Sequence, residues 1–506
     1  MADNKYYTEN QNTLYIYDFD EVYVQLSGDR SILKHISEYF TFDVPGKEFV
    51  PAYKEKLWDG KLRLLCWQTG RLYKGLLKYI LLFCKNNNYK FILEDSLKND
   101  IKGQSLDLND FFKSLKLTLI PYDFQDRTIK YCLSKKRATV VSPTSSGKSL
   151  IAYIIIRWLL QNTTEKILIT VPTIGLVNQL YNDFIEYDPE WNIADNIHKI
   201  CEGSPDESHQ RIYISTWQAI FRKKKPYFSQ FGAVIIDEAH QGDANSLKGI
   251  MEKCVNADYR YGLSGTIKET KCHRAVIEGL FGPIIQFVTT RTLMDKGIVS
   301  DLNIKCLLLK YSDKDKKDFK KHISTTKNKY QGEIDFIVHC KKRNRFIGKI
   351  VSNMKDKSNC LILTDFHNKK EHVRLIKEEI EAVTDKTVIT ITGNSDAEAR
   401  ELVRKYTENN TNVVIIATFG TFSTGISIKN LQYLIFATNS KSMVKVLQSI
   451  GRSLRLDGKT NSVTVYDLID ELELSGKRNY LLRHFFERVK LYIIEKFKYK
   501  IVSINI

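Results

Sequence analysis

One short segment around Lys148 constrains the fold of this chain more than any other part of the sequence. An apolar run over residues 138–141 leads into the small residues 142–147, then Lys148 and Ser149, and then an apolar helical pattern over 150–160. This order of strand, tight turn and helix is typical of a phosphate-binding loop, where backbone N–H groups at a helix N-terminus meet phosphate oxygens. In such a loop the lysine contacts the β/γ-phosphates and the serine hydroxyl is a ligand of Mg²⁺.

Gly-Lys-Ser is weak on its own, because a turn that caps a helix has the same composition and because Ser142 stands where the P-loop pattern has its first glycine. A second element downstream strengthens the interpretation. The apolar run 233–236 ends in Asp237 and Glu238, and two adjacent acids at the C-terminal end of a strand are typical of a Walker B site. We expect Asp237 to bind Mg²⁺ and Glu238 to polarise the attacking water. The predicted cofactors are ATP and Mg²⁺, held by the loop residues Thr144, Ser145, Ser146, Gly147, Lys148 and Ser149.

The composition is that of a soluble globular protein with a polyanionic partner. A length of 506 residues predicts three or four domains. The formal net charge of +18 favours nucleic acid over a membrane as the partner, with a merely basic protein as the alternative. Nine cysteines occur singly, so we expect reduced thiols, a cytoplasmic setting and no zinc site. We find no secretion signal and no apolar run long enough for a bilayer, so no membrane association is expected.

Residues 1–105 are predicted to form a small basic α+β domain. Strands are expected at 14–17 and 22–26, and a helix over 31–40 that begins with a serine cap. The polar stretch 94–110 is expected to link this domain to the next one.

Within this domain, the segment 54–90 is rich in Lys and Arg, which are interleaved with aromatic residues. Such a mixture is typical of a nucleic-acid surface, because cations meet phosphates and rings stack on bases. The alternative is a solvated basic face above an aromatic core. In the first interpretation, Lys61, Arg63 and Lys74 contact nucleic acid.

The pair Asp59-Gly60 lies between the apolar residues 57–58 and 62–64 and is predicted to be a hairpin turn. An acid followed by Lys61, with Asp43 upstream, would also suit Mg²⁺ binding in a nuclease. The turn explains the same residues more simply, so no nuclease site is expected.

From residue 117 onward, strands alternate with helical segments, which predicts parallel sheets covered by helices. We expect two successive α/β lobes, over 106–300 and 301–475, with the phosphate loop only in the first. The lysine-dense stretch 301–331 is expected to be linker and edge structure. The basic tail 476–506 has a helical pattern and is expected to dock on the second lobe, with DNA contact as the lesser alternative. The strands predicted after 138–141 are 166–170, 212–215, 233–236, 261–263, 360–364, 388–391, 413–417, 434–436 and 463–466.

Small polar residues follow many of these strands. Open α/β sheets place their chemistry at the carboxyl ends of the strands, and hydroxyl groups there grip phosphates without reading base sequence. Each residue alone is also explained as a helix cap, but their recurrence favours a nucleic-acid track. The predicted contacts are Thr173, Thr216, Thr364, His367 and Thr418.

Residues 448–455 carry Arg452 and Arg455, which are three apart and would share one face of a helix. A guanidinium on that face neutralises charge that develops on the γ-phosphate, as an arginine finger does. A pair of surface arginines is the alternative. We predict that both arginines act in ATP hydrolysis.

Taken in order, these motifs resemble those of the superfamily 2 helicases and translocases over residues 117–470. Their order and spacing make the resemblance specific at the level of the superfamily. The matching segments are Lys148 with Ser149 for motif I, 237–240 for motif II (the DEAH box), 264–266 for motif III, 418–428 with Gly425 for motif V, 448–455 for motif VI, and 121–125 for the adenine-recognition element, in which Gln125 would bond the base edge.

Within the superfamily, residues 262–266 and 451–455 resemble the double-stranded-DNA translocases and restriction motors. The whole chain resembles the recombination and fork-remodelling helicases of T-even bacteriophages. This resemblance implies two tandem RecA-like lobes behind the N-terminal domain, ATP-driven unwinding of branched DNA, branch migration, and removal of RNA from R-loops. It also implies a role in recombination, repair and replication in the cytoplasm of an infected host cell.

The chain departs from the family pattern at two positions. Ser145 replaces the usual glycine of motif I, which the loop tolerates if the backbone there is ordinary. Ser427 stands where many relatives have a ribose-binding aspartate in motif V, so selectivity for the nucleotide sugar is open.

We interpret the chain as a monomeric ATP-dependent translocase whose lobes close on ATP and grip one strand. The expected partners are single-stranded, forked and branched DNA, RNA–DNA hybrids, and recombination or single-strand-binding proteins. Three alternatives remain open: an RNA helicase, the motor subunit of a restriction system, and a DNA-binding scaffold with an inactive ATPase. The candidates for coupling the nucleotide site to the strand-end loops are His240, Ser264, Thr266 and Gln448.

Overall fold

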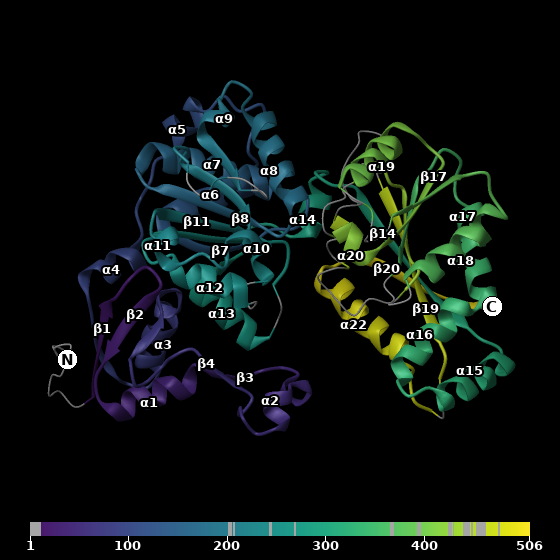
Figure 1. Ribbon diagram of the computed structural model, residues 1–506, viewed down its shortest axis with the longest axis horizontal. Coiled ribbons are helices and arrows are strands. Elements are labelled where there is room, and N and C mark those ends of the chain that lie inside the picture. The colour runs from purple at the N-terminus through teal and green to yellow at the C-terminus, as the bar shows by residue number, and fades with distance from the viewer. Residues whose placement is uncertain are drawn as a thin grey trace. The chain divides into compact units, whose positions relative to one another are not determined.

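The computed structural model shows two seven-stranded parallel sheets and a smaller mixed sheet in the N-terminal part (Figure 1). This confirms the predicted fold class, two RecA-like α/β lobes with a small N-terminal domain. Contacts divide the chain into two compact units, one of residues 1–142 and 147–287 and one of residues 143–146 and 288–506. The structure describes residues 12–200, 205, 208–241, 245–267, 270–364, 369–391, 395, 397–423, 428, 430–438, 446, 449–451, 462–473 and 476–506.

The N-terminal domain is built on a four-stranded mixed sheet. Along β1 (Thr13–Asp18), Leu14 and Ile16 are fully buried on one face, as the two-residue period of a strand requires. The predicted strands and the helix α1 (Arg30–Tyr39) are present. The serine cap is wrong, because the carboxylate of Asp29 caps α1 by accepting a hydrogen bond from Ser31 N at 2.7 Å. The other elements are β2 (Tyr23–Ser27), β5 (Arg71–Tyr73), η2 (Lys74–Leu76), α3 (Leu77–Asn86) and β6 (Lys90–Leu93).

A two-stranded arm extends from this domain (Figure 1). Its strands β3 (Thr41–Asp43) and β4 (Lys61–Arg63) pair antiparallel. The hairpin prediction for Asp59-Gly60 is wrong in its partner. Gly60 does adopt a left-handed turn conformation, with φ +74°, but β4 pairs with β3 and not with residues 57–58. Residues 57–58 form no ladder with β4, because the N–H groups of both donate to Ala52 O. Between the two strands lie η1 (Lys47–Phe49) and α2 (Pro51–Lys54).

The first lobe holds a sheet of parallel strands with helices on both faces. On β8 (Lys166–Val171), Ile167 and Ile169 pack with α6 and α7, whereas Leu168 packs on the opposite face. Because the strands are parallel, their carboxyl ends meet at one edge of the sheet. The strand order is β13 (Ile284–Ile285), β7 (Arg137–Val141), β12 (Tyr259–Ser264), β11 (Phe231–Asp237), β8, β10 (Ile212–Thr216) and β9 (Ile197–Ile200). The helices are α5 (Asn109–Ser114), α6 (Asp123–Lys135), α7 (Lys148–Asn162), α8 (Ile174–Tyr187), α9 (Ile193–Asn196), α10 (Trp217–Ile220), α11 (Lys225–Phe228), α12 (Asn245–Lys253) and α13 (Lys271–Phe281), with the short η3 (Ala239–Gln241).

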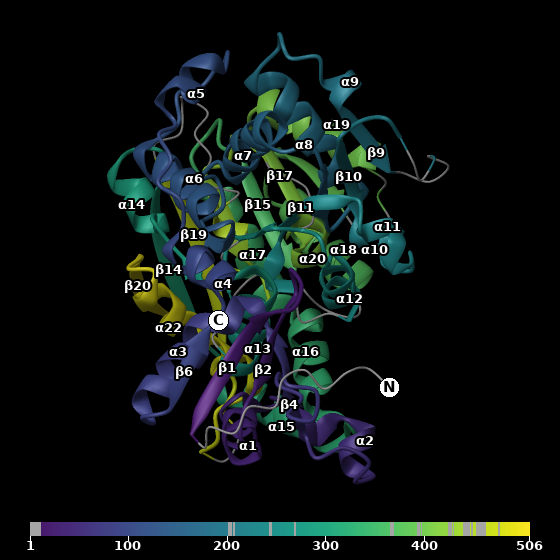
Figure 2. The same ribbon diagram turned by 90° about the vertical axis from the view of Figure 1, so that its left-hand side faces the viewer.

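The N-terminal domain and the first lobe share one hydrophobic core, and α13 lies against the N-terminal domain (Figure 2). A Cβ on Gly75 would lie 2.0 Å from Glu278 O, so only glycine allows this approach. Tyr79 on α3 donates to the Glu278 carboxylate at 2.8 Å, and Tyr73 donates to Glu252 at 2.5 Å. The predicted linker 94–110 is helical: it forms α4 (Asp95–Lys102), which contacts both β1 and α6, and part of α5.

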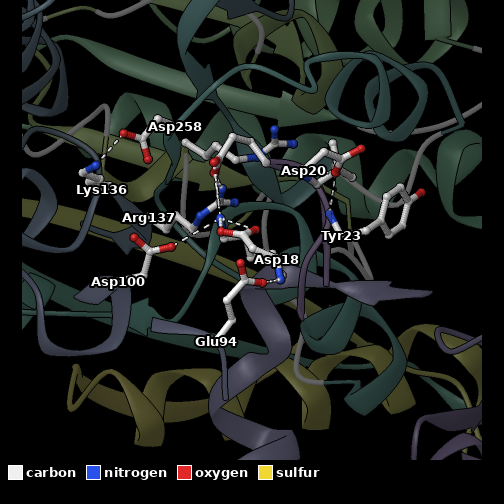
Figure 3. A network of polar contacts seen from close by, with 12 residues as sticks. Asp18, Asp20, Tyr23, Glu94, Asp100, Lys136, Arg137 and Asp258 are labelled. Carbon is white, nitrogen blue, oxygen red and sulfur yellow. Dashed lines mark hydrogen bonds and ion pairs between the residues drawn. The ribbon is translucent and has the colours of Figure 1, made fainter. Parts of the chain in front are cut away.

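Ion pairs reinforce this junction (Figure 3). Lys74 Nζ lies 2.9 Å from Asp18, 3.2 Å from Glu21 and 3.3 Å from Asp100. Arg137, the first residue of β7, pairs with Glu21. Burial alone would raise the pKa of Glu21, but Arg137 and Lys74 outweigh it and lower that pKa. The network therefore connects the N-terminal domain to the strand that leads into the phosphate loop.

The second lobe repeats the parallel sheet. The prediction of linker and edge structure for 301–331 is wrong: β14 (Asp301–Lys310) lies inside the sheet, between β19 (Ser462–Glu471) and β20 (Lys498–Asn505). The full order is β16 (Thr387–Ile391), β17 (Val413–Thr418), β15 (Cys360–Thr364), β18 (Tyr433–Phe436), β19, β14 and β20. The helices are α14 (Thr290–Asp295), α15 (Asp313–Thr325), α16 (Lys329–His339), α17 (Lys341–Ser352), α18 (Lys369–Glu381), α19 (Ala397–Asn409), α20 (Phe419–Ser423) and α22 (Tyr480–Ile494).

Two buried ion pairs hold helices of the second lobe to β19. Arg343 of α17 binds Asp470 at 2.8 Å, and Arg488 of α22 binds Asp467 at 2.8 Å. The two aspartates are three residues apart, so they point to opposite faces of the strand. The docking predicted for the tail is confirmed, but its helical pattern covers only α22, since residues 498–505 form β20.

Within the described residues, no helix combines the length and the apolar character needed to cross a membrane.

Candidate ATP site

The loop between β7 and α7 has the backbone of a phosphate cradle. Gly147, the N-cap of α7, has φ +77°, a left-handed conformation that favours glycine. A Cβ at this position would lie 2.3 Å from Gln125 Nε2, so the glycine also allows the side-chain amide of Gln125 to approach the loop. Gln125 is buried, and its Oε1 accepts a hydrogen bond from Tyr122 N at 2.8 Å. These two contacts hold the amide of Gln125 beside the loop. The predicted bond from this amide to adenine stays a prediction.

The two serines that replace family glycines differ in their backbone. Ser142 does not adopt a positive φ, so a side chain is tolerated there. Ser145 has φ +68°, so the condition of an ordinary backbone at this position is not met. A left-handed conformation costs a residue with a Cβ about 1–2 kcal/mol. The loop therefore holds a strained serine where the family has glycine.

The cationic and hydroxyl groups predicted to meet phosphate and Mg²⁺ lie at the start of α7. Lys148 Nζ donates to Ser142 O at 3.0 Å, which holds the ammonium against the backbone of the loop. The Ser149 hydroxyl lies 2.6 Å from the Tyr187 hydroxyl at the end of α8. Tyr187 was not predicted, and no local pattern marks it, because 38 residues separate it from Ser149.

Asp237 and Glu238 lie where β11 ends, next to the carboxyl end of β12. Asp237 is half-buried and Glu238 has φ +54°, a strained conformation of the kind that clusters at active sites. Serine hydroxyl and aspartate carboxylate are the hard oxygen ligands that suit Mg²⁺ together with phosphate oxygens. The residue types therefore fit a Mg²⁺–ATP complex.

A continuous chain of polar contacts links the second and third motifs. His240 Nδ1 lies 3.1 Å from Glu238 Oε2 and 3.1 Å from Ser264 Oγ. Ser264 Oγ in turn donates to Thr266 O at 2.6 Å. Three of the four residues predicted to couple the nucleotide site to the loops are thus linked by polar contacts, the fourth being Gln448, and coupling itself stays a prediction.

Several predicted residues lie outside the described part of the chain. They are His367, Gly425, Ser427, Gln448, Arg452 and Arg455.

Two of the predicted nucleic-acid contacts are wrong for this geometry. Thr364 is fully buried and its hydroxyl donates to Ala417 O at 3.4 Å. Thr418 is 2% exposed and its hydroxyl oxygen accepts a hydrogen bond from Thr421 N at 3.2 Å. Both hydroxyl groups are therefore engaged in hydrogen bonds within the second lobe. Thr173 caps α8 by accepting from Leu176 N at 3.3 Å, and for Thr173 and the largely buried Thr216 the contact stays a prediction.

The predicted cations of the N-terminal domain separate into two kinds. Lys61 and Arg63 are exposed on β4, and the hydrogen bond from Arg63 lowers the pKa of Asp59 to about 2. Lys74 is 4% exposed and surrounded by Asp18, Glu21 and Asp100, so its predicted contact with nucleic acid is wrong. Its ammonium compensates these half-buried carboxylates and is itself almost inaccessible to solvent.

Three family models match the chain. Residues 13–94 match the N-terminal domain of the DNA helicase UvsW, residues 116–269 match the res subunit of type III restriction enzymes, and residues 341–457 match the helicase conserved C-terminal domain. The three matches follow the N-terminal domain, the first lobe and the second lobe in order.

Individual relatives extend this similarity over the whole chain. The ATP-dependent DNA helicase uvsW of Enterobacteria phage T4 is 32% identical, over 97% of this chain and 99% of the relative. A crystal structure of T4 UvsW covers 97% of this chain and 99% of its own, with 28% identity and a TM-score of 0.51. The type ISP restriction-modification enzyme LlaBIII bound to DNA shares the fold, with 15% identity, a TM-score of 0.56, and coverage of 83% of this chain and 34% of its own.

Proposed function

Because the chain belongs to the UvsW-like ATP-dependent DNA helicases, we propose that it remodels branched DNA. The substrates are replication forks, four-way junctions and RNA–DNA hybrids in R-loops, and the protein acts as a monomer in the cytoplasm of an infected cell. The observation that carries the proposal is the shared core of the N-terminal domain and the first lobe. Through this core, a DNA contact on the arm is joined firmly to the lobe that holds the phosphate loop.

ATP is held by the loop 144–149, with the ammonium of Lys148 on the β/γ-phosphates and the Gln125 amide at the base. Ser149 and Asp237 hold Mg²⁺, which supplies charge neutralisation on the phosphates when bound. Glu238 orients the attacking water. Arg452 and Arg455 stabilise the charge that develops on the γ-phosphate.

Coupling to movement runs through His240. Its imidazole lies 3.1 Å from both Glu238 and Ser264, so a shift of the Glu238 carboxylate during hydrolysis is transmitted to the third motif. Ser264 passes the shift to Thr266 through the 2.6 Å hydrogen bond to its carbonyl. Thr173 and Thr216 hold the tracking strand at neighbouring strand ends, together with His367 of the second lobe. In the second lobe, Gln448 takes part in the same coupling, and Gly425 contributes to binding of the nucleotide.

Substrate choice is made by the arm. Lys61 and Arg63 lie exposed on β4. They contact phosphates of the double-stranded DNA next to the branch point. Such contacts are independent of base sequence, which suits a junction-specific enzyme. Recombination proteins and single-strand-binding proteins are further partners in that setting.

The test compares ATP hydrolysis and strand separation across matched nucleic acids. We expect forked DNA and R-loops to stimulate hydrolysis more than linear duplex DNA, and duplex RNA to stimulate it least. Lys148→Ala is the inactive control. Equal or greater stimulation by duplex RNA would contradict the proposal and favour an RNA helicase, and an absence of stimulation by every nucleic acid would favour a scaffold.

A further inference from the structure

A cavity of about 610 Å³ opens at the edge of the second lobe's sheet where the strands begin. Ser358 precedes β15, Thr411 precedes β17, and Tyr433 is the first residue of β18. We call this cavity the strand-start pocket. The carboxyl ends of the same parallel strands, where Thr364 and Thr418 pair, lie at the opposite edge of the sheet. The pocket is therefore separate from the strand ends that carry the helicase motifs.

Two tyrosine rings form a platform in the strand-start pocket. Tyr433 of β18 and Tyr466 of β19 stack with their centroids 6.3 Å apart and an interplanar angle of 17°. Tyr433 lies opposite Thr464 in the parallel ladder, which places both rings on one face of the sheet. Both are half-buried, so each ring is supported from below and reachable from solvent. Aromatic rings held in this way are platforms on which nucleobases stack.

Positive charge surrounds the platform. Lys305 Nζ lies 5.5 Å from the centroid of the Tyr466 ring. The acidic residues of the lining are Asp356 and Glu408, and Glu408 already pairs with Arg404 at 2.7 Å. The excess of cations beside rings suits phosphate groups flanking a stacked base. The exposed lysines of the lining are Lys305, Lys355 and Lys357.

Next to the lining residue Ser358, one buried amide holds the surrounding backbone in place. Asn359 Nδ2 donates to the backbone carbonyls of Thr407, Asn410 and Asn430 at 3.1, 2.9 and 3.0 Å. Its Oδ1 accepts from Val413 N at 2.9 Å. These bonds tie the starts of three strands together, so a ligand meets a surface that needs little reorganisation. Asn430 and Gln432 line the same pocket, but Gln432 Nε2 donates to Asn430 Oδ1 at 2.8 Å and Gln432 Oε1 accepts from Asn359 N at 2.7 Å. Asn409, which also lines the pocket, is the amide that we assign to a base edge.

We propose that the strand-start pocket binds single-stranded nucleic acid. One base stacks on the Tyr433–Tyr466 platform, its edge meets the Asn409 amide, and the adjoining phosphates contact Lys305 and Lys355. An acidic protein segment would use the lysines but leave the stacked rings and the amide without a role, so the ring chemistry favours a polynucleotide. The inference extends the proposed helicase function, because unwinding releases a strand that this second site retains.

The direct test is photo-crosslinking of the full-length protein to short oligonucleotides that carry 5-iodouracil. We expect crosslinked peptides that contain Tyr433 or Tyr466, identified by mass spectrometry. Matched experiments with a DNA oligonucleotide and an RNA oligonucleotide show which kind of single strand the pocket prefers. The crosslink yield at these two peptides measures binding in the strand-start pocket only. Oligonucleotides bound at the opposite edge of the sheet, where the helicase motifs lie, do not contribute to it.

Matched variants make the test specific. The double variant Lys305→Gln, Lys355→Gln should reduce the slope of log affinity against log salt at this site by about 0.7 for each lysine lost. Tyr433→Leu should weaken binding about tenfold, whereas Tyr433→Phe keeps the ring and should retain it. Lys320→Gln, an exposed lysine on α15, is the control and should behave as wild type. Circular dichroism confirms that each variant is folded.

Crosslinks at Tyr433 or Tyr466 that disappear in Lys305→Gln, Lys355→Gln and persist in Lys320→Gln support the proposal. An absence of crosslinks at both peptides overturns it, as does a yield that none of the pocket variants changes. Competition by polyglutamate as strong as that by an oligonucleotide also overturns it, since the pocket would then recognise acidic protein. Failure of DNA-stimulated ATP hydrolysis would refute the proposed function and leave this crosslinking result to stand by itself.

Discussion

The two lobes share one architecture but place charge in opposite ways. In the first lobe, Asp237 and Glu238 stand half-buried at the end of a strand, where a ligand can meet them. In the second lobe, Asp467 and Asp470 lie fully buried within β19, each against an arginine from a covering helix. A buried pair recovers little more than its own desolvation cost, so it orients helices more than it stabilises them. The same fold thus uses edge charges for chemistry and interior charges for architecture.

The largest effect should follow from removing edge charges. Lys148→Ala should abolish ATP turnover, because the cation on the β/γ-phosphates is lost, and Glu238→Gln should keep ATP binding while hydrolysis collapses. Steady-state ATPase assays with nucleotide-binding titrations measure both. Lys130→Ala, an exposed lysine on α6, is the control. Near-normal turnover in either variant would remove that residue from the site.

Arg455→Ala comes next in size. If Arg455 acts as an arginine finger, the hydrolysis rate should fall by about 10³–10⁵-fold while nucleotide affinity changes much less. Single-turnover kinetics separates the two quantities. Arg404→Ala on α19 is the control, because its ion pairs with Glu401 and Glu408 lie on its own helix. A loss of affinity as large as the loss of rate would assign Arg455 to binding.

Interior charges should affect stability. Arg343→Met leaves Asp470 buried and unpaired, and breaking a buried pair in this way costs about 3–5 kcal/mol in the free energy of unfolding. Arg345→Met, two residues along the same helix, breaks an exposed contact with Glu379 and should cost less than about 1 kcal/mol. Urea denaturation followed by hydrogen exchange in β19 measures the difference. Equal losses of stability in the two variants would show that the buried pair contributes no more than the exposed pair.

The smallest effect concerns the two kinds of lysine in the N-terminal domain. Lys61→Gln should reduce the salt slope of duplex DNA binding by about 0.9, the contribution of one phosphate contact. Lys74→Gln should leave that slope unchanged and lower the thermal midpoint instead, because Asp18 and Asp100 lose the cation that they share. Fluorescence anisotropy at several salt concentrations and thermal scans measure the pair. A slope change in Lys74→Gln would show that this buried lysine does meet DNA.

Local patterns account for what could be predicted. Apolar runs of four to six residues predicted most strands, and the motif order predicted both lobes, because strand period and loop chemistry are readable over short windows. The burial of Lys74 was not readable, since its three carboxylates come from separate elements of the N-terminal domain. Nor was β20, whose alternation of lysines and apolar residues resembles a solvated tail until β14 supplies its ladder. Contacts between distant segments decided both cases.

The place of β14 in its sheet has a consequence for synthesis of the protein. Its two neighbours, β19 and β20, follow it in the chain by more than 150 and 180 residues. At about 5–20 residues per second, β14 leaves the ribosome about 10–40 s before β20 arrives to pair with it. During that interval its backbone donors and acceptors form an open edge, the feature that invites pairing with another chain. Slower translation or crowded ribosomes should therefore increase aggregation of the nascent second lobe, and a chaperone that shields strand edges should reduce it.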